Sequence, residues 1–338
     1  MNLDTIYKVL EPLGFTLEVE QPHINGERFL MAKDKLVLVA KYRGERVIIK
    51  ISNTPDGQKD IQNEKQARDL LKSISFANKA IHFPEERYWG EKDDYTIWAI
   101  EFIEQEKIFV NHTLEEQFFL ILKALEEQES FHATTYEHLA TVKKIFPIMS
   151  AQDYFKEFSN FRPALEEAQS LLRANKSILD KYSGYLTHTD FVPHNFRIRH
   201  REIYMLDCAP EVRTVHFGNK YEGWARLLNY MIIHNPPLEK LLANYVRSNR
   251  GEEEYLSLRL MRVYKIGFLL NFYTKSLEKT EGDLKTLTLE RIDFWQEVLA
   301  HILKDEAVPI TFVDDYKKKR DNLRSDEEKR RQREFAVA

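Results

Sequence analysis

The feature that most constrains this chain is the way its strand-forming and helix-forming segments divide along the sequence. β-Branched residues concentrate in residues 36–42 and 45–52, on either side of a turn that contains Gly44, and this arrangement predicts a β-hairpin. A third apolar run, residues 96–103, is also typical of a strand. Beyond residue 112 the apolar spacing becomes helical. The sequence therefore predicts an α+β protein whose first part is built on a sheet and whose second part is mostly helix.

The length of the chain favours two cores. With 338 residues it exceeds what a single hydrophobic core usually serves. We expect a smaller lobe with one helix over residues 1–103 and a larger, mainly helical lobe over residues 104–310. The remaining residues, 311–338, form a charged tail, in which residues 314–334 are nearly all charged with both signs mixed. This composition predicts a solvated helix or a disordered tail.

Helical spacing places one carboxylate on an inward-facing stripe. Residues 60–74 bring Glu64 to the side of the predicted helix that also carries Ile61, Leu71 and Ile74. In the second part, Thr113 and Glu116 have the spacing of a capping box. The spacing predicts further helical segments in residues 151–181, 221–234, 237–249, 252–277 and 282–303.

Charge and cysteine content exclude several classes of protein. Fifty Lys and Arg residues against 54 Asp and Glu give a net charge of -4, which does not favour nucleic acid or an acidic membrane as a partner. Cys208 is the only cysteine, so no internal disulfide can form. No apolar run approaches the ~18 residues that span a bilayer, and the first residues lack the pattern of a signal peptide. We expect a cytoplasmic protein.

One short segment has the composition of a phosphoryl-transfer site. His188, Asp190 and Asn195 form the pattern His-x-Asp-x-x-x-x-Asn, and a hydrophobic strand then ends at Asp207. Phosphoryl transfer needs a carboxylate that orients the attacking hydroxyl, and an Asn with a second Asp that hold magnesium on the phosphates. The alternative is that Asp190 and Asn195 only cap turns around Pro193.

A lysine and a glutamate in the first part fit the same chemistry. Lys50 follows a β-branched strand, a position from which an ammonium can contact nucleotide phosphates. Glu64 follows on the predicted helix and would hold that ammonium in place. The alternative is a strand-edge lysine in water and a surface glutamate.

The order of these features resembles the protein-kinase-like superfamily over roughly residues 20–305. Within it the chain looks like the aminoglycoside phosphotransferase and choline kinase branch, whose loop reads His-Gly-Asp-x-x-x-x-Asn and whose metal strand reads Ile-Asp. Here Thr189 replaces the Gly and Leu206 replaces the Ile. The resemblance implies a bilobal fold, with ATP and Mg²⁺ as cofactors.

The resemblance also implies a role for each site residue. Asp190 would be the catalytic base, with Asn195 and Asp207 as magnesium ligands. Lys50 would bind the phosphates and Glu64 would be its partner. The adenine would bind to the backbone of a hinge formed by Glu101, Phe102 and Ile103. His132 and His188 are interpreted as structural.

The spacing after Asp207 favours a small-molecule hydroxyl as the acceptor, such as an aminoglycoside, an amino alcohol or a sugar. Helical sequence resumes near Tyr221, which leaves little room for the peptide-docking segment of a protein kinase. A protein kinase is therefore the weaker alternative. Glu211, just past the metal strand, would suit a cationic amine, or it is simply a turn residue in water.

Two departures from the family pattern favour a third possibility, a pseudokinase or nucleotide-binding module without catalysis. No glycine lies near residues 32–35, where the hairpin over the phosphates is expected, so Lys33 or Lys35 would have to replace it unless both are solvated turn lysines. Gly223 also stands where the family carries a loop-anchoring Asp, and Glu222 is the residue that could take over that role.

Overall fold

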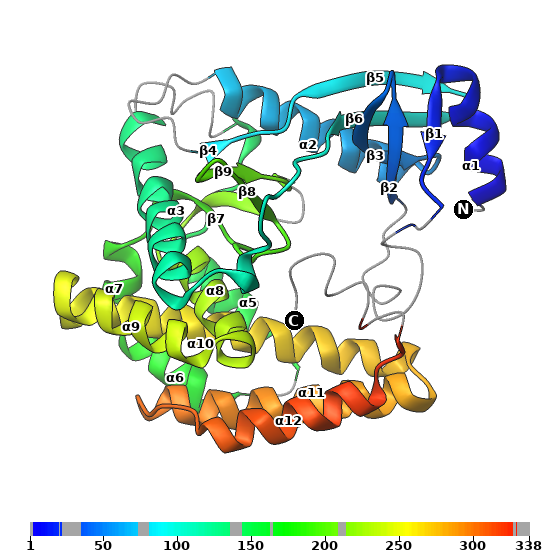
Figure 1. Ribbon diagram of the computed structural model, residues 1–338. Coiled ribbons are helices and arrows are strands. Elements are labelled where there is room, and N and C mark those ends of the chain that lie inside the picture. Colours follow the sequence, from blue (N-terminus) through cyan, green and yellow to red (C-terminus); the bar gives the residue numbers. More distant parts are fainter. Residues whose placement is uncertain are drawn as a thin grey trace.

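The computed structural model separates into a smaller, sheet-based lobe and a larger helical lobe (Figure 1). The sheet lies at one end of the molecule, and helices α11 (Gly282–Leu303) and α12 (Ile310–Leu323) lie at the other end. The structure describes residues 3–19, 21, 35–73, 81–135, 144–162, 165–208, 214–326 and 329.

The first lobe is built on a five-stranded antiparallel sheet with strand order β1-β2-β3-β6-β5. The predicted hairpin is confirmed, because β2 pairs with β3 and the two turn residues Arg43 and Gly44 have φ values of 50° and 85°. Helix α1 and the short helix η1 pack at one end of this sheet. The bounds are α1 (Leu3–Leu10), η1 (Glu11–Leu13), β1 (Phe15–Leu17), β2 (Leu36–Tyr42), β3 (Glu45–Ser52), β5 (Glu86–Lys92) and β6 (Tyr95–Glu101).

Helix α2 (Pro55–Ser73) connects the two lobes. Near its start, Ile61 packs against Trp98 and Ile100 of the sheet. Further along, Ala67 and Leu71 join an apolar cluster that belongs mostly to the second lobe and includes Phe146, Leu186, Met205 and Phe217. The predicted helix is thus confirmed, although it begins earlier than expected, and Ile74 lies outside the described residues. Because α2 packs on both lobes, its polar residues lie where the lobes meet.

Two small sheets lie beneath α2 in the second lobe. Strand β7 (Tyr185–His188) pairs with β10 (Val215–Gly218), while β8 (Phe196–Arg199) and β9 (Glu202–Met205) form an antiparallel hairpin. The two-residue strand β4 (Ile81–His82) adds to β9 in parallel. Strand β4 therefore belongs to a sheet of the second lobe, although it precedes residue 103, the predicted end of the first lobe.

The helical lobe has α8 at its centre. Apart from Arg226 and His234, every residue of α8 is buried. The predicted capping box of α3 is confirmed, because Thr113 and Glu116 exchange hydrogen bonds of 3.0 and 3.2 Å between side chain and backbone. The bounds are η3 (Phe109–Asn111), α3 (Leu114–Thr135), α5 (Ala151–Ser159), α6 (Glu166–Ala174), α7 (Lys176–Lys181), α8 (Glu222–His234), α9 (Pro236–Arg250), α10 (Glu252–Ser276) and η5 (Leu277–Lys279).

The first part of the predicted charged tail is an ordered helix. In α12, Val313 and Tyr316 are buried, and the Tyr316 ring stacks on Phe294 of α11 with ring centroids 4.0 Å apart. This part of the tail therefore packs on the helical lobe. Within the described ranges, none of the helices has the length and apolar character that crossing a bilayer requires.

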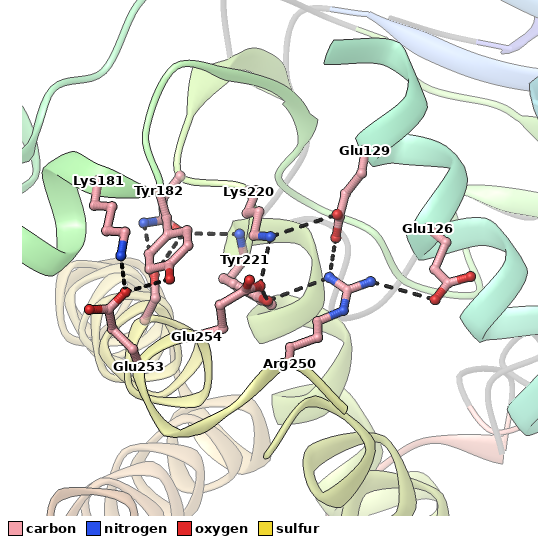
Figure 2. A network of polar contacts seen from close by, with 11 residues as sticks. Glu126, Glu129, Lys181, Tyr182, Lys220, Tyr221, Arg250, Glu253 and Glu254 are labelled. Carbon is pink, nitrogen blue, oxygen red and sulfur yellow. Dashed lines mark hydrogen bonds and ion pairs between the residues drawn. The ribbon is translucent and has the colours of Figure 1, made fainter. Parts of the chain in front are cut away.

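A network of polar side chains holds the start of α8 in place (Figure 2). Just before the helix, the Lys220 ammonium lies 2.7 Å from Glu254 and 3.7 Å from Glu129. Arg250, at the end of α9, pairs with Glu129, and the hydroxyl of Tyr221 donates to Glu254. These contacts tie α3, α9 and α10 to the segment that leads into α8.

Candidate active site

The loop that connects β7 to β8 carries the predicted base and one predicted metal ligand. The side-chain amide of Asn195 donates to the backbone carbonyl of Asp190 at 2.8 Å and to its Oδ2 at 2.9 Å. The backbone carbonyl of Asn195 in turn accepts from the amide of Leu206 at 2.9 Å. Because Phe196 and Met205 are paired across the β8–β9 hairpin, Asn195 and Asp207 lie at the same end of it. The structure thus brings Asp190, Asn195 and Asp207 together.

His188 supports this loop from behind. Its Nε2 donates to the backbone carbonyl of Asp207 at 2.8 Å, and its side chain is buried. Burial lowers the pKa of His188, although the nearby carboxylates of Asp207 and Asp190 oppose the shift. A neutral imidazole that bonds to the backbone holds the end of the metal strand in place, which agrees with the structural role expected for this residue.

The predicted pairing of Lys50 with Glu64 is present in the structure. The two side chains form an ion pair in which Glu64 has no exposed surface. Arg68, one turn further along α2, lies 3.4 Å from Glu64 and donates from Nη2 to the backbone carbonyl of Leu206 at 2.8 Å. The helix that carries Glu64 is therefore hydrogen-bonded directly to the residue before Asp207.

A second lysine lies beside Lys50. The ammonium of Lys35 is 2.6 Å from Asp60 and 3.6 Å from Glu64. Burial lowers the pKa of Lys35, but Glu64, Asp207 and Asp60 outweigh it, so the net shift is upward. Burial also lowers the pKa of Lys50, against the attraction of Glu64 and Asp207. Two ammonium groups therefore lie within electrostatic reach of Asp207, the predicted metal ligand.

Arg226 is a site residue that the sequence reasoning missed. Its Nε donates to Oδ1 of Asp190 at 2.6 Å. Loss of solvent raises the pKa of Asp190, but the Arg226 guanidinium outweighs it and lowers that pKa to about 2. The Asp190 side chain remains 42% exposed, so a ligand can reach this ionised carboxylate.

The residues of the predicted hinge differ in what they offer a nucleotide. The amide of Glu101 donates to the carbonyl of Glu85 at 2.8 Å, and the amide of Phe102 donates to the carbonyl of Arg46 at 3.2 Å. Within the described part of the chain, the amide of Ile103 donates to no other group. Of the three hinge amides, that of Ile103 is therefore the one available to donate a hydrogen bond to an adenine. Adenine binding at the hinge stays a prediction.

Glu222 does not anchor the catalytic loop as the sequence suggested. It accepts from the hydroxyl of Tyr154 at 2.7 Å and from His216 at 2.7 Å, and it pairs with Lys265 at 2.6 Å. These contacts tie α8 to α5, β10 and α10. A hydrogen bond from α8 to the loop is made by Arg226 instead.

Three predicted positions fall outside what the structure describes. They are Lys33, Glu211 and the side chain of His132.

The donor atoms present fit the magnesium and phosphates that the sequence implies. Because the Asn195 amide nitrogen faces Asp190, its Oδ1 is left as an oxygen donor, and in the described part of the chain that oxygen accepts no hydrogen bond. Mg²⁺ prefers oxygen ligands and is commonly held by one or two side chains together with phosphates. No group of three or more His, Cys, Asp or Glu side chains among the described residues is arranged to hold a metal. A site of this two-ligand kind does not require one.

The sequence itself matches no protein-family profile and no curated protein. The fold, in contrast, is similar to solved structures. Aminoglycoside 2'-phosphotransferase-IIIa, as its GDP complex, has a TM-score of 0.59 at 10% identity, covering 88% of this chain and 99% of its own. A thermostable mutant of aminoglycoside phosphotransferase APH(4)-Ia has a TM-score of 0.58 at 13% identity, covering 88% and 97%. Macrolide 2'-phosphotransferase type I has a TM-score of 0.55 at 11% identity, covering 85% and 95%.

These comparisons confirm the predicted fold class. The chain has the bilobal, protein-kinase-like fold of the aminoglycoside and macrolide phosphotransferases. At such low identities the likeness concerns the fold, and the activity has to be argued from the site.

Proposed function

We propose that this protein is an ATP- and Mg²⁺-dependent phosphotransferase that moves the γ-phosphoryl group to a hydroxyl of a small molecule. The observation that carries the proposal is the convergence of Asp190, Asn195 and Asp207 beside the buried ion pair of Lys50 and Glu64. Phosphoryl transfer depends mainly on positioning and on neutralising charge, and these are the groups it needs. The fold likeness to phosphotransferases of small molecules supports the same proposal.

Different residues of the site would bind the phosphates, the adenine and Mg²⁺. Lys50, held by Glu64, would contact the phosphates, while the backbone amide of Ile103 would donate a hydrogen bond to the adenine. Asn195 and Asp207 would hold Mg²⁺, which supplies positive charge to the phosphate oxygens when it is bound. Lys35 offers a second ammonium near the same carboxylate, in the segment where the sequence lacks glycine.

Asp190 is suited to orient the acceptor hydroxyl. Its pKa of about 2 keeps it ionised at neutral pH, so it can accept the proton of the attacking hydroxyl. The low pKa makes it a weak base, which is compatible with this reaction because the proton leaves late, when the new bond to phosphorus is well formed. Positioning of the hydroxyl is therefore its main contribution.

A second candidate function is nucleotide binding without transfer. The observation that favours it is that both oxygens of Asp190 already accept hydrogen bonds, Oδ1 from Arg226 and Oδ2 from Asn195. In that case the protein would bind MgATP and leave every acceptor unphosphorylated.

Transfer and binding assays separate the two functions. We expect the wild type to bind MgATP and to transfer labelled phosphate from γ-labelled ATP to a component of a small-molecule extract. Asp190→Asn should reduce transfer by at least about a hundredfold and leave MgATP affinity nearly unchanged. Asp180→Asn, on the exposed face of α7, is the matched control and should transfer normally. Wild-type binding without transfer to any component would favour the non-catalytic function.

A further inference from the structure

Arg226 stands out within α8. It is one of two residues of this helix that are not buried, and its side chain is 21% exposed. The helix itself is held firmly, because the network of Figure 2 fixes the segment before it and Glu222 is bound on three sides. The position of Arg226 beside Asp190 is therefore set by the fold of the lobe.

The guanidinium of Arg226 has more donors than its contact with Asp190 uses. A guanidinium carries five N–H groups, and the bond to Asp190 uses the one on Nε. Within the described part of the chain, the two Nη groups have no hydrogen-bond partner, and neither belongs to the buried unpaired atoms. Two parallel N–H groups in this fork match the two oxygens of a carboxylate or phosphate.

The charges around Asp190 favour an anion over a polycation. Lys265 acts on Asp190 electrostatically, but its own charge is balanced by Glu222 at 2.6 Å. The charge of Asp190 is balanced by Arg226, whose Nε lies 2.6 Å from Oδ1 of Asp190. The carboxylate of Asp190 is thus already paired with a cation, whereas the open side of Arg226 attracts an oxyanion.

Building on the proposed function, we propose that Arg226 is an oxyanion-binding residue of this site. It binds a carboxylate or phosphate group next to the catalytic carboxylate and thereby positions the acceptor hydroxyl against Asp190. The oxyanion has two sources with the same chemistry. One is an acidic group on the acceptor, which makes the substrate a hydroxy acid or a sugar phosphate, and the other is the terminal phosphate of the nucleotide.

Calorimetric titration without nucleotide tests the acceptor as the source. The probes are glucose, glucosamine and glucose 6-phosphate, which share one ring and differ in charge. We expect the wild type to bind glucose 6-phosphate at least about tenfold more tightly than the other two, and Arg226→Gln to remove this preference. Arg173→Gln, an exposed arginine at the end of α6, is the matched control and should keep it.

A second titration tests the nucleotide as the source. If the oxyanion is the terminal phosphate, Arg226→Gln weakens binding of MgAMP-PNP relative to MgADP by about tenfold or more. Arg226→Lys keeps the charge without the fork, so it should show a smaller loss in the same direction. If circular dichroism shows that Arg226→Gln does not fold, Arg226→Lys is used for this titration in its place.

A change in either titration supports the proposal, and it identifies the source. If Arg226→Gln leaves both the charge preference and the nucleotide ratio as in the wild type, the proposal is overturned. Failure of the wild type to bind MgAMP-PNP would instead contradict the proposed function, and the sugar titration would still decide the role of Arg226.

Discussion

Lys50 in β3 and Glu64 in α2 form a buried ion pair, and Glu64 also faces Lys35 and Arg68. One carboxylate thus faces three cations at the boundary between the lobes, with Asp60 as a further partner of Lys35. Arg68 continues this cluster to the backbone of Leu206 in the second lobe. The pair therefore belongs to the contact that joins the lobes as well as to the candidate nucleotide site.

We predict that Glu64→Gln destabilises the protein strongly. The substitution leaves buried cations without their shared partner, and removing one member of a buried ion pair typically costs about 3 kcal/mol or more. Urea denaturation measures the loss in the free energy of unfolding.

The matched control is Asp69→Asn on the same helix. The ion pair of Asp69 with Lys65 is exposed, so we expect the free energy of unfolding to change by no more than about 0.5 kcal/mol. Equal effects of the two substitutions would show that the burial of Glu64 does not matter.

Titration of Asp190 should depend on Arg226. The pKa of this carboxyl is lowered from 3.8 to about 2, so the ion pair contributes stability above pH 3.8 that is lost as the pH falls through about 2. Because the side chain is 42% exposed, solvent screening reduces the contribution to about 1 kcal/mol. In Arg226→Gln, the carboxyl should titrate closer to its ordinary pKa, as followed by NMR of carbon-labelled aspartate.

Arg173→Gln is again the control and should leave that titration unchanged. An Asp190 pKa that is the same in Arg226→Gln as in the wild type would contradict the ion pair.

Arg250 should be the most sensitive residue of the polar network in Figure 2. Its side chain is largely buried, pairs with Glu129, contacts the hydroxyl of Tyr221 at 3.4 Å and lies over the ring of Trp224. We expect Arg250→Leu to lower the free energy of unfolding by about 2 kcal/mol, because Glu129, itself partly buried, loses this largely buried partner. Thermal unfolding at neutral pH measures the effect.

Lys181→Leu provides the comparison within the same network. The ion pair of Lys181 with Glu253 is exposed, so the free energy of unfolding should change by no more than about 0.5 kcal/mol. A larger effect at Lys181 than at Arg250 would reverse the ranking that burial predicts.

Much of the fold was predictable because its signals are local. The β2–β3 hairpin follows from β-branched runs around Gly44, and the start of α3 follows from the capping box of Thr113 and Glu116. Strand β4 has no such signal, since two residues pair with a strand more than a hundred residues later. Helix α12 was predicted to be a solvated or disordered tail because Tyr316 is nearly alone among the charged residues that follow Val313.

In the candidate site, too, some residues have a local sequence signal and others do not. Lys50, Glu64, Asp190, Asn195 and Asp207 were found because their order and spacing carry the signal. Arg226 was missed because its contact with Asp190 depends on how α8 is rotated against a loop far away in the sequence, which no local pattern encodes. Glu222 has the more conspicuous position, yet the structure turns it towards His216 and Lys265.

The most direct test of the central claim is a crystal structure with MgAMP-PNP. We predict Mg²⁺ at about 2.1 Å from Oδ1 of Asn195 and from a carboxylate oxygen of Asp207, with Lys50 on the phosphates. The terminal phosphate should face Asp190. A nucleotide bound away from these four side chains, or bound among them without a metal at Asn195 and Asp207, would contradict the account.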